Sequence, residues 1–256
     1  MVTVFCVDIG LLNLSFCVVT SGKNVSDISE FKINLWEVYN TLPITDQFCQ
    51  EIQKNKKICN KKCSFKNSEN NLETFYCKKH FPKNIEIKKK NKFSKKKISS
   101  FTLQEIALIF LKKIQEIYDE NESIFESVDK IFIELQPTCA RKMVFVSHIL
   151  YGKFIDLYKD TKVPIKFVRA SQKLKSYTGP FIDCHLKSKY ARRKWLSIEY
   201  CKWFLENKFS KEQKDIWLPK FLDGRTLADN SDTALMCINA ICGVPKTKQK
   251  NGEDIK

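Results

Sequence analysis

The chain has 256 residues, of which 43% are hydrophobic, so it can bury the core of one large domain, or of a domain with an insertion. This composition excludes wholesale disorder. The 45 Lys and Arg residues outnumber the 29 Asp and Glu residues, which gives a net charge of +16. Such an excess favours a polyanionic partner, either a nucleic acid or an anionic membrane surface, although biased coding also produces Lys- and Asn-rich chains.

Three features of the sequence argue against a membrane-embedded or secreted protein. The longest apolar run, from Ile106 to Leu111, is far too short to cross a bilayer. The first residues lack a basic region, and Asp8 stands where a signal peptide would be apolar. Eleven cysteines are an odd number for a disulfide framework. We therefore expect an intracellular, cytoplasmic protein with reduced thiols, and the basic run over 88–97 leaves the nucleus open.

Three apolar segments follow one another closely at the start of the chain. They cover residues 2–9, 14–19 and about 28–39. Because a parallel crossover needs a dozen residues or more, these three strands are predicted to form an antiparallel meander.

Helical and strand patterns alternate from residue 102 onward. Apolar residues at helical spacing predict a helix from about 103 to 118, and a short buried strand is expected at 130–135. Later patterns predict helices at about 140–158, 187–206 and 230–242, and a strand at 165–168. The order predicts an α/β fold in which helices cover a mixed sheet.

Residues 41–98 differ from the rest of the chain. They are polar and rich in Lys and Asn, and eight of the fifteen residues over 83–97 are lysines. We interpret this stretch as an insertion followed by a mobile basic linker. The polar residues 244–256 are expected to be a disordered tail.

The insertion contains a pattern typical of zinc sites. Cys59 and Cys63 form one close pair, and Cys77 and His80 form a second, so the four side chains can close a tetrahedron around Zn²⁺. Cys49 is a spare or substitute ligand. A structural metal would explain how a segment with little apolar periodicity folds, whereas the alternative is that biased coding scattered these cysteines.

Acidic residues are scarce, and four of them lie in otherwise apolar elements. These are Asp8, Glu134, Asp229 and Asp232. Each alone has an ordinary explanation as a helix cap, a strand end or an ion-pair partner. Together they would repel strongly unless divalent cations lay between them, and hard carboxylate oxygens suit Mg²⁺ or Mn²⁺. Two such ions could activate water and stabilise the leaving oxygen of a phosphodiester, which indicates a nuclease.

The ordered set of acids resembles a known family. Asp8 in Val-Asp-Ile-Gly, Asn13, Glu134 in Ile-Glu-Leu-Gln, and the late pair Asp229 and Asp232 are similar to the RuvC-type Holliday junction resolvases, most of all those of poxviruses and related large DNA viruses. The resemblance covers about 1–40 and 100–243.

The resemblance implies an RNase H-like catalytic domain made of 1–40 and 99–243, interrupted by the zinc-binding insertion 41–98. It further implies a homodimer that nicks opposing strands of a four-way DNA junction, with two Mg²⁺ ions held by the four acids. For a viral member, the place of action would be the site of viral replication. Cationic residues that could contact phosphates are Lys187, Lys189, Arg192, Arg193 and Lys194, together with Arg141 and Lys142.

Two other functions share these sequence features. Another RNase H-like nuclease, acting on RNA–DNA hybrids or flaps, would use the same four acids. A non-catalytic, zinc-dependent nucleic-acid-binding protein would have acids with only structural roles.

Overall fold

The chain divides into two units in the computed structural model, which is described here for residues 1–42, 48–53, 56–69, 72–83, 85–88, 91–93, 97–224 and 226–243. One unit combines 1–41 with 103–256, and the other is 42–102. The expected tail, 244–256, lies outside the described residues.

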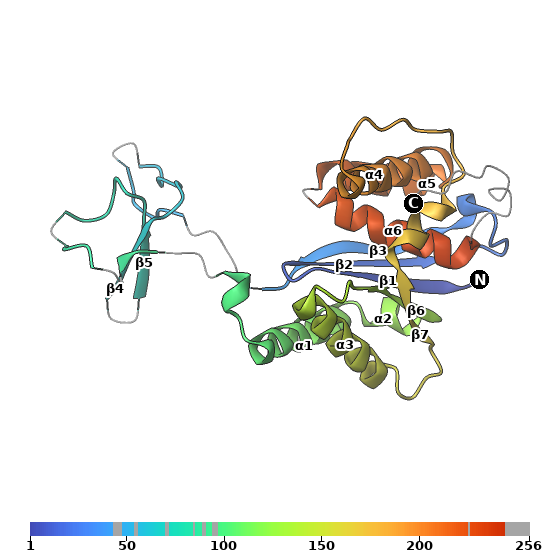
Figure 1. Ribbon diagram of the computed structural model, residues 1–256, viewed down its shortest axis with the longest axis horizontal. Helices are drawn as coiled ribbons and strands as arrows, with labels where there is room; N and C mark the ends of the chain where they lie inside the picture. Colours follow the sequence, from blue (N-terminus) through green and yellow to red (C-terminus); the bar gives the residue numbers. More distant parts are fainter. Residues whose placement is uncertain are drawn as a thin grey trace. The chain divides into compact units, whose positions relative to one another are not determined.

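A five-stranded mixed sheet forms the centre of the first unit (Figure 1). Its strands are β1 (Thr3–Ile9), β2 (Asn13–Thr20), β3 (Lys32–Asn40), β6 (Lys130–Leu135) and β7 (Ile165–Arg169). Their order across the sheet is β3-β2-β1-β6-β7. The first three strands pair antiparallel, whereas β6 is parallel to both β1 and β7. The predicted meander and the predicted α/β fold with a mixed sheet are confirmed.

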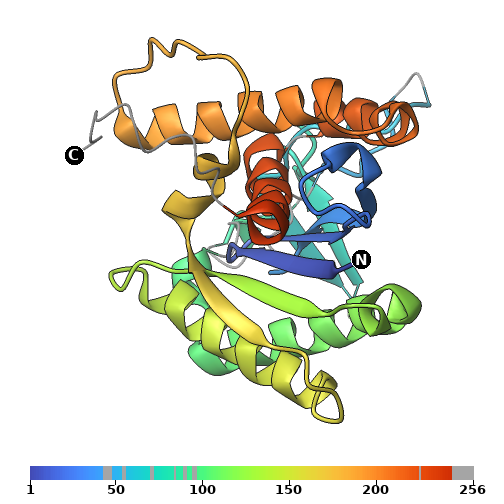
Figure 2. The same ribbon diagram turned by 90° about the vertical axis from the view of Figure 1, so that its right-hand side faces the viewer.

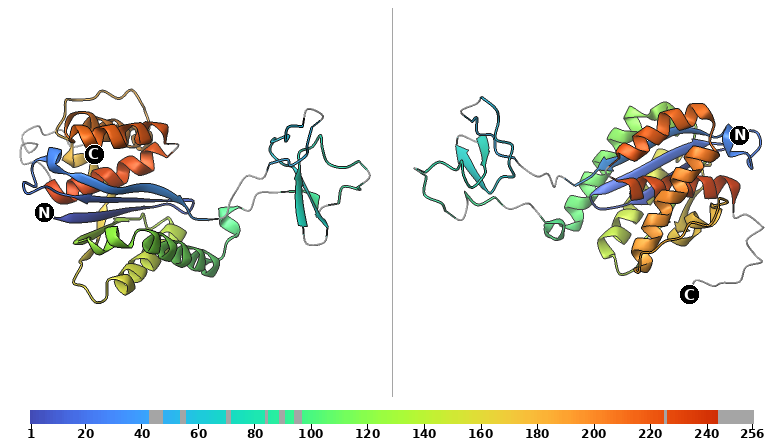
Figure 3. Two further views of the ribbon diagram at one scale, coloured as in Figure 1. Left: turned by 180° about the vertical axis from the view of Figure 1, so that it is seen from behind. Right: turned by 90° about the horizontal axis from the view of Figure 1, so that it is seen from above.

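Helices cover both faces of this sheet (Figures 1 and 2). Their bounds are α1 (Leu103–Glu120), α2 (Glu122–Glu126), α3 (Arg141–Leu157), α4 (Lys189–Asn207), α5 (Lys211–Asp223) and α6 (Leu227–Cys242). α1 and α3 pack together on one face, and α6 packs directly on β1 and β2 from the other. α4 lies over α6, as the two views of Figure 3 also show.

Strand β1 is buried along its whole length because helices cover it on both sides. Below the sheet, Phe5 contacts Phe16, Phe125 and Phe154 edge to face, with ring centroids 4.9, 5.1 and 5.4 Å apart. Edge-to-face contacts of this kind add to the stability gained by burying the rings. β1 is therefore a rigid support for the side chains at its carboxyl end.

One substantial helix of this unit was not predicted. α5 contains Pro219 in its interior, and proline usually marks the end of a helix. Its start carries a usable signal, however, because the Ser210 hydroxyl accepts a hydrogen bond from the N–H of Gln213. The third predicted strand also begins later than expected, with a short 3₁₀ helix over Ile28–Glu30 before β3.

The second unit contains an antiparallel hairpin, β4 (Phe65–Glu69) and β5 (Leu72–Tyr76). Part of the predicted basic linker lies outside the described residues. In the part of the chain that is described, none of the helices combines the length and the apolar character needed to cross a membrane.

Candidate functional site

Asp8 and Glu134 lie side by side at one edge of the sheet. β1 and β6 are parallel, with Val7 beside Ile133, so the next residue of each strand is also a neighbour of the other. Each of the two acids is only 8% exposed, and their side chains hydrogen-bond to each other. The two acids come together because the carboxyl ends of parallel strands meet at the same edge of a sheet.

The first turns of α6 bring Asp229 and Asp232 to the same place. Asp232 is 2% exposed, and its Oδ1 accepts a hydrogen bond from the hydroxyl of Ser197 in α4. Asp229 accepts a hydrogen bond from Asn13 Nδ2 at 3.3 Å. The carboxylates of the four predicted acids thus gather where β1, β6 and α6 meet.

Two lysines lie among these carboxylates. Lys173 belongs to a 3₁₀ segment, Ala170–Ser176, directly after β7, and its Nζ lies 2.6 Å from Asp232 Oδ2 and 3.2 Å from Glu134 Oε1. Lys194 of α4 lies 3.1 Å from Asp232 Oδ2 and 3.5 Å from Asp229 Oδ1. The lysines join the strand acids and the helix acids into one ion-pair network.

The electrostatics of the network follow from its burial. Burial, the hydrogen bond to Glu134 and the charge of Glu134 raise the pKa of Asp8 well above its usual range, against the opposing effect of Lys173. Burial alone would lower the pKa values of Lys173 and Lys194, but the attraction of the carboxylates outweighs it and raises both. Both lysines are therefore charged at neutral pH, and Asp8 retains its proton to a higher pH than an exposed aspartate.

The donor chemistry of this site fits a hard divalent cation. Four carboxyl groups offer the oxygen ligands that Mg²⁺ prefers, and two ammonium groups could not balance them if all four were ionised. A metal ion between Glu134 and Asp232 would compete with the ammonium group of Lys173, which already lies there.

The predicted phosphate contacts fall into two groups. Lys187, Lys189, Arg192 and Arg193, at and before the start of α4, are exposed, and so is Arg141 at the start of α3. Lys142 is half-buried. Lys194 differs from this expectation because it is partly buried and its Nζ is paired with Asp229 and Asp232.

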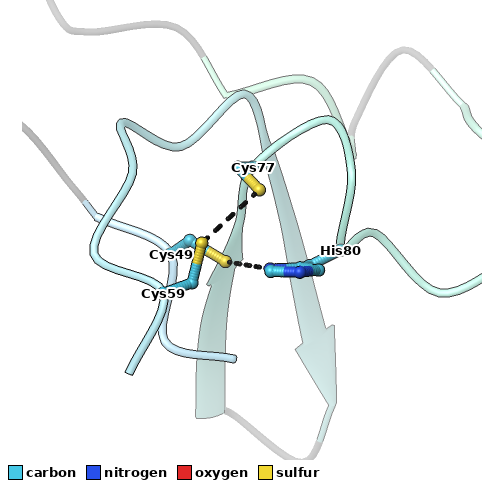
Figure 4. A group of neighbouring side chains, drawn as sticks. All are labelled: Cys49, Cys59, Cys77 and His80. Atoms are coloured by element: carbon cyan, nitrogen blue, oxygen red, sulfur yellow. Dashed lines mark hydrogen bonds between the residues drawn. The ribbon is translucent and has the colours of Figure 1, made fainter. Parts of the chain in front are cut away.

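The structure also changes the expected set of zinc ligands. Cys49, Cys59, Cys77 and His80 have ligand atoms within 4.8 Å of one another (Figure 4). Cys63, which the close spacing favoured, is not part of this group. Cys49 takes its place because chain pairing brings residues 49 and 59 together.

Comparisons with known proteins give one curated relative and several similar structures. The chain is 23% identical to uncharacterized protein L451 of Acanthamoeba polyphaga mimivirus, over 94% of this chain and 66% of that protein, slightly less than two thirds of its length. No protein-family model matches the chain.

Solved structures similar to this chain include those of RuvC and of a poxvirus resolvase. They include Thermus thermophilus RuvC (13% identity, TM-score 0.45, covering 94% of this chain and 97% of that one). The same protein with a Holliday junction substrate gives 11% identity and a TM-score of 0.42, covering 95% and 97%. Fowlpox virus resolvase with Holliday junction DNA gives 12% identity and a TM-score of 0.41, covering 93% and 98%.

The raised pKa of Asp8 predicts that the ionised Asp8 side chain lowers the stability of the protein at neutral pH. The folded state holds the Asp8 proton more tightly than the unfolded chain does. The contribution of Asp8 to the free energy of unfolding therefore falls as the pH rises above about 4. We expect Asp8→Asn, whose amide can still donate to Glu134, to raise the free energy of unfolding by about 1 kcal/mol at pH 7. The gain should vanish as pH falls to about 4.

Urea unfolding at several pH values measures this difference, and Asp156→Asn, at an exposed position on α3, is the matched control. A stability gain that is the same at pH 4 and pH 7 would contradict a raised pKa of Asp8 in the folded protein.

Proposed function

We propose that the chain is a Mg²⁺-dependent endonuclease that resolves four-way DNA junctions by paired nicks, acting as a homodimer. The observation that carries the proposal is the meeting of Asp8, Glu134, Asp229 and Asp232 at one edge of the sheet. The resemblance of these acids and their order to RuvC-type resolvases supports a four-way junction as the substrate.

Each group of the site has a role that its position supports. Asp8, Glu134, Asp229 and Asp232 would hold the ions, which when bound lower the pKa of water and stabilise the leaving oxygen of the phosphodiester. Ser197 orients Asp232, and Asn13 orients Asp229, through their hydrogen bonds.

The two lysines of the site contribute in two ways. Lys173 and Lys194 hold the carboxylates together before substrate binds, because unpaired carboxylates this close to one another would repel. A positive charge at this depth also attracts the phosphate that is to be cut. The reaction needs no covalent intermediate, because water attacks the phosphorus directly.

The ion pairs themselves favour a second candidate. Because Lys173 and Lys194 already satisfy these acids, the cluster could serve stability alone, in a non-catalytic nucleic-acid-binding protein. A nuclease acting on RNA–DNA hybrids or flaps would instead use the same acids on another substrate.

Cleavage of a synthetic four-way junction in Mg²⁺ separates these functions. We expect symmetric nicks with the wild type, and a rate at least about 100-fold lower in Asp8→Asn and Glu134→Gln, with junction binding retained or strengthened. Linear duplex, flap and RNA–DNA hybrid are the control substrates, and Asp156→Asn is the control variant.

Cutting of the hybrid or flap in preference to the junction would retain the site and change the substrate. Tight binding without any cleavage, equal in wild type and both variants, would contradict a nuclease.

Exposed cations at the start of α4 should contribute to DNA affinity through the phosphate backbone. In Arg192→Gln/Arg193→Gln we expect junction binding to weaken, and the slope of log K against log salt to become shallower by about 2, because two phosphate contacts are lost. Lys162→Gln, an exposed cation after α3, is the matched control. Fluorescence anisotropy over a salt series measures the slope, and an unchanged slope in the double variant would remove this surface from the interface.

A further inference from the structure

A group of three thiols and one imidazole forms the centre of the second unit. The ligand atoms of Cys49, Cys59, Cys77 and His80 all lie within 4.8 Å of one another, and their side chains point toward a common centre (Figure 4). The cysteines are 1%, 9% and 5% exposed, so the group is largely closed to solvent.

Two hairpins bring these four residues together. Residues 48–53 run antiparallel to residues 56–62, with Phe48 bridged to Lys62 and Ile52 to Ile58, so that Cys49 and Cys59 lie on opposite arms. Cys77 follows β5, and His80 is in the turn after it, with its N–H donating to the Cys77 carbonyl.

The two hairpins are also joined by their backbones, since the N–H of Gln50 donates to the carbonyl of Phe75 at 3.0 Å. The ligands are therefore positioned by backbone pairing, not only by their own contacts.

The separations within the group match those of a tetrahedral metal site. With Zn–S of about 2.3 Å and Zn–N of about 2.05 Å, a tetrahedron places two sulfurs about 3.8 Å apart and a sulfur and a nitrogen about 3.6 Å apart. Here Cys59 Sγ and Cys77 Sγ are 3.9 Å apart, and Cys49 Sγ and His80 Nδ1 are 3.5 Å apart. The sulfurs of a disulfide would be about 2.0 Å apart, so the spacing favours a shared metal over a covalent bond.

The unit has little else to hold it together. Among the described residues from 48 to 93, the buried side chains of the apolar class are those of the three cysteines and Phe81. Ile52, Ile58 and Ile87 are more than half exposed. A small unit with so few buried apolar side chains usually depends on a metal or on disulfides to fold.

The positive charge of the unit further increases its need for a stabilising metal. Residues 42–102 contain sixteen lysines, no arginine and five acidic residues, a net charge of +11 in a chain of +16. Mutual repulsion opposes compaction of such a segment. Three thiolates and a neutral imidazole around a divalent ion leave one net negative charge at its centre, which partly offsets the repulsion.

We infer that residues 42–102 form a zinc-dependent module in which Cys49, Cys59, Cys77 and His80 hold one structural Zn²⁺. Sulfur and imidazole ligands in a closed, four-coordinate arrangement are typical of structural zinc. The inference does not depend on the proposed nuclease function, because its ligands belong to the second unit.

Zinc content of the full-length protein, purified under reducing conditions, tests the ligand set. We expect about one Zn²⁺ per chain in the wild type, and a loss of most of it in Cys49→Ser and Cys59→Ser. Cys63→Ser is the matched control, since Cys63 lies in the same unit but outside the group, and it should retain the metal. Substituted Co²⁺ should give the visible absorption of a tetrahedral thiolate site in the wild type and in Cys63→Ser.

Limited proteolysis keeps the test decisive if a serine variant folds poorly. Removing the metal from the wild type with a chelator should speed cleavage within 42–102 at least about tenfold, and added Zn²⁺ should reverse the effect. Reduced wild-type protein that contains no zinc and takes up neither Zn²⁺ nor Co²⁺ would overturn the inference. Loss of zinc in Cys63→Ser with retention in Cys49→Ser would overturn the ligand set.

Discussion

The functional site of the first unit depends on the balance of charge where β1, β6 and α6 meet. Four acids at this point are almost surrounded by apolar elements, and a buried carboxylate is costly unless a cation compensates it. Lys173 and Lys194 supply that compensation from two different segments. The site therefore needs β7, the 3₁₀ segment after it and α4 in place, as well as the elements that carry the acids.

The mixed sheet provides this arrangement through its topology. β1 lies between an antiparallel neighbour and a parallel one, so its carboxyl end is beside that of β6 and beside the start of β2. Strand order places Asp8 beside Glu134. The packing of α6 on β1 and β2 brings Asp232, more than two hundred residues after Asp8, close enough for its charge to act on Asp8. The burial of β1 holds Asp8 in place.

Sequence patterns predicted the four acids and the strands that carry Asp8 and Glu134. Lys194 was expected only as a phosphate contact, and Lys173 was not predicted at all. Acids stood out because they interrupt apolar runs, whereas Lys173 is one of 45 Lys and Arg residues and lies in a segment without periodicity. Close spacing likewise favoured Cys63 as a ligand over Cys49. In the structure Cys49 is the ligand instead, because backbone pairing brings it beside Cys59 from the opposite arm of a hairpin. The number of residues between cysteines in the sequence does not reveal this pairing.

We propose that the four acids form a metal centre and not only an ion-pair network. Binding of Mn²⁺, followed by electron paramagnetic resonance in the wild type and in Glu134→Gln and Asp232→Asn, tests this most directly. We expect each substitution to weaken Mn²⁺ binding at least about tenfold, and Cys49→Ser, in a site of soft ligands, to leave it unchanged. Equal Mn²⁺ affinity in the wild type and both acid variants would contradict a metal centre at these acids.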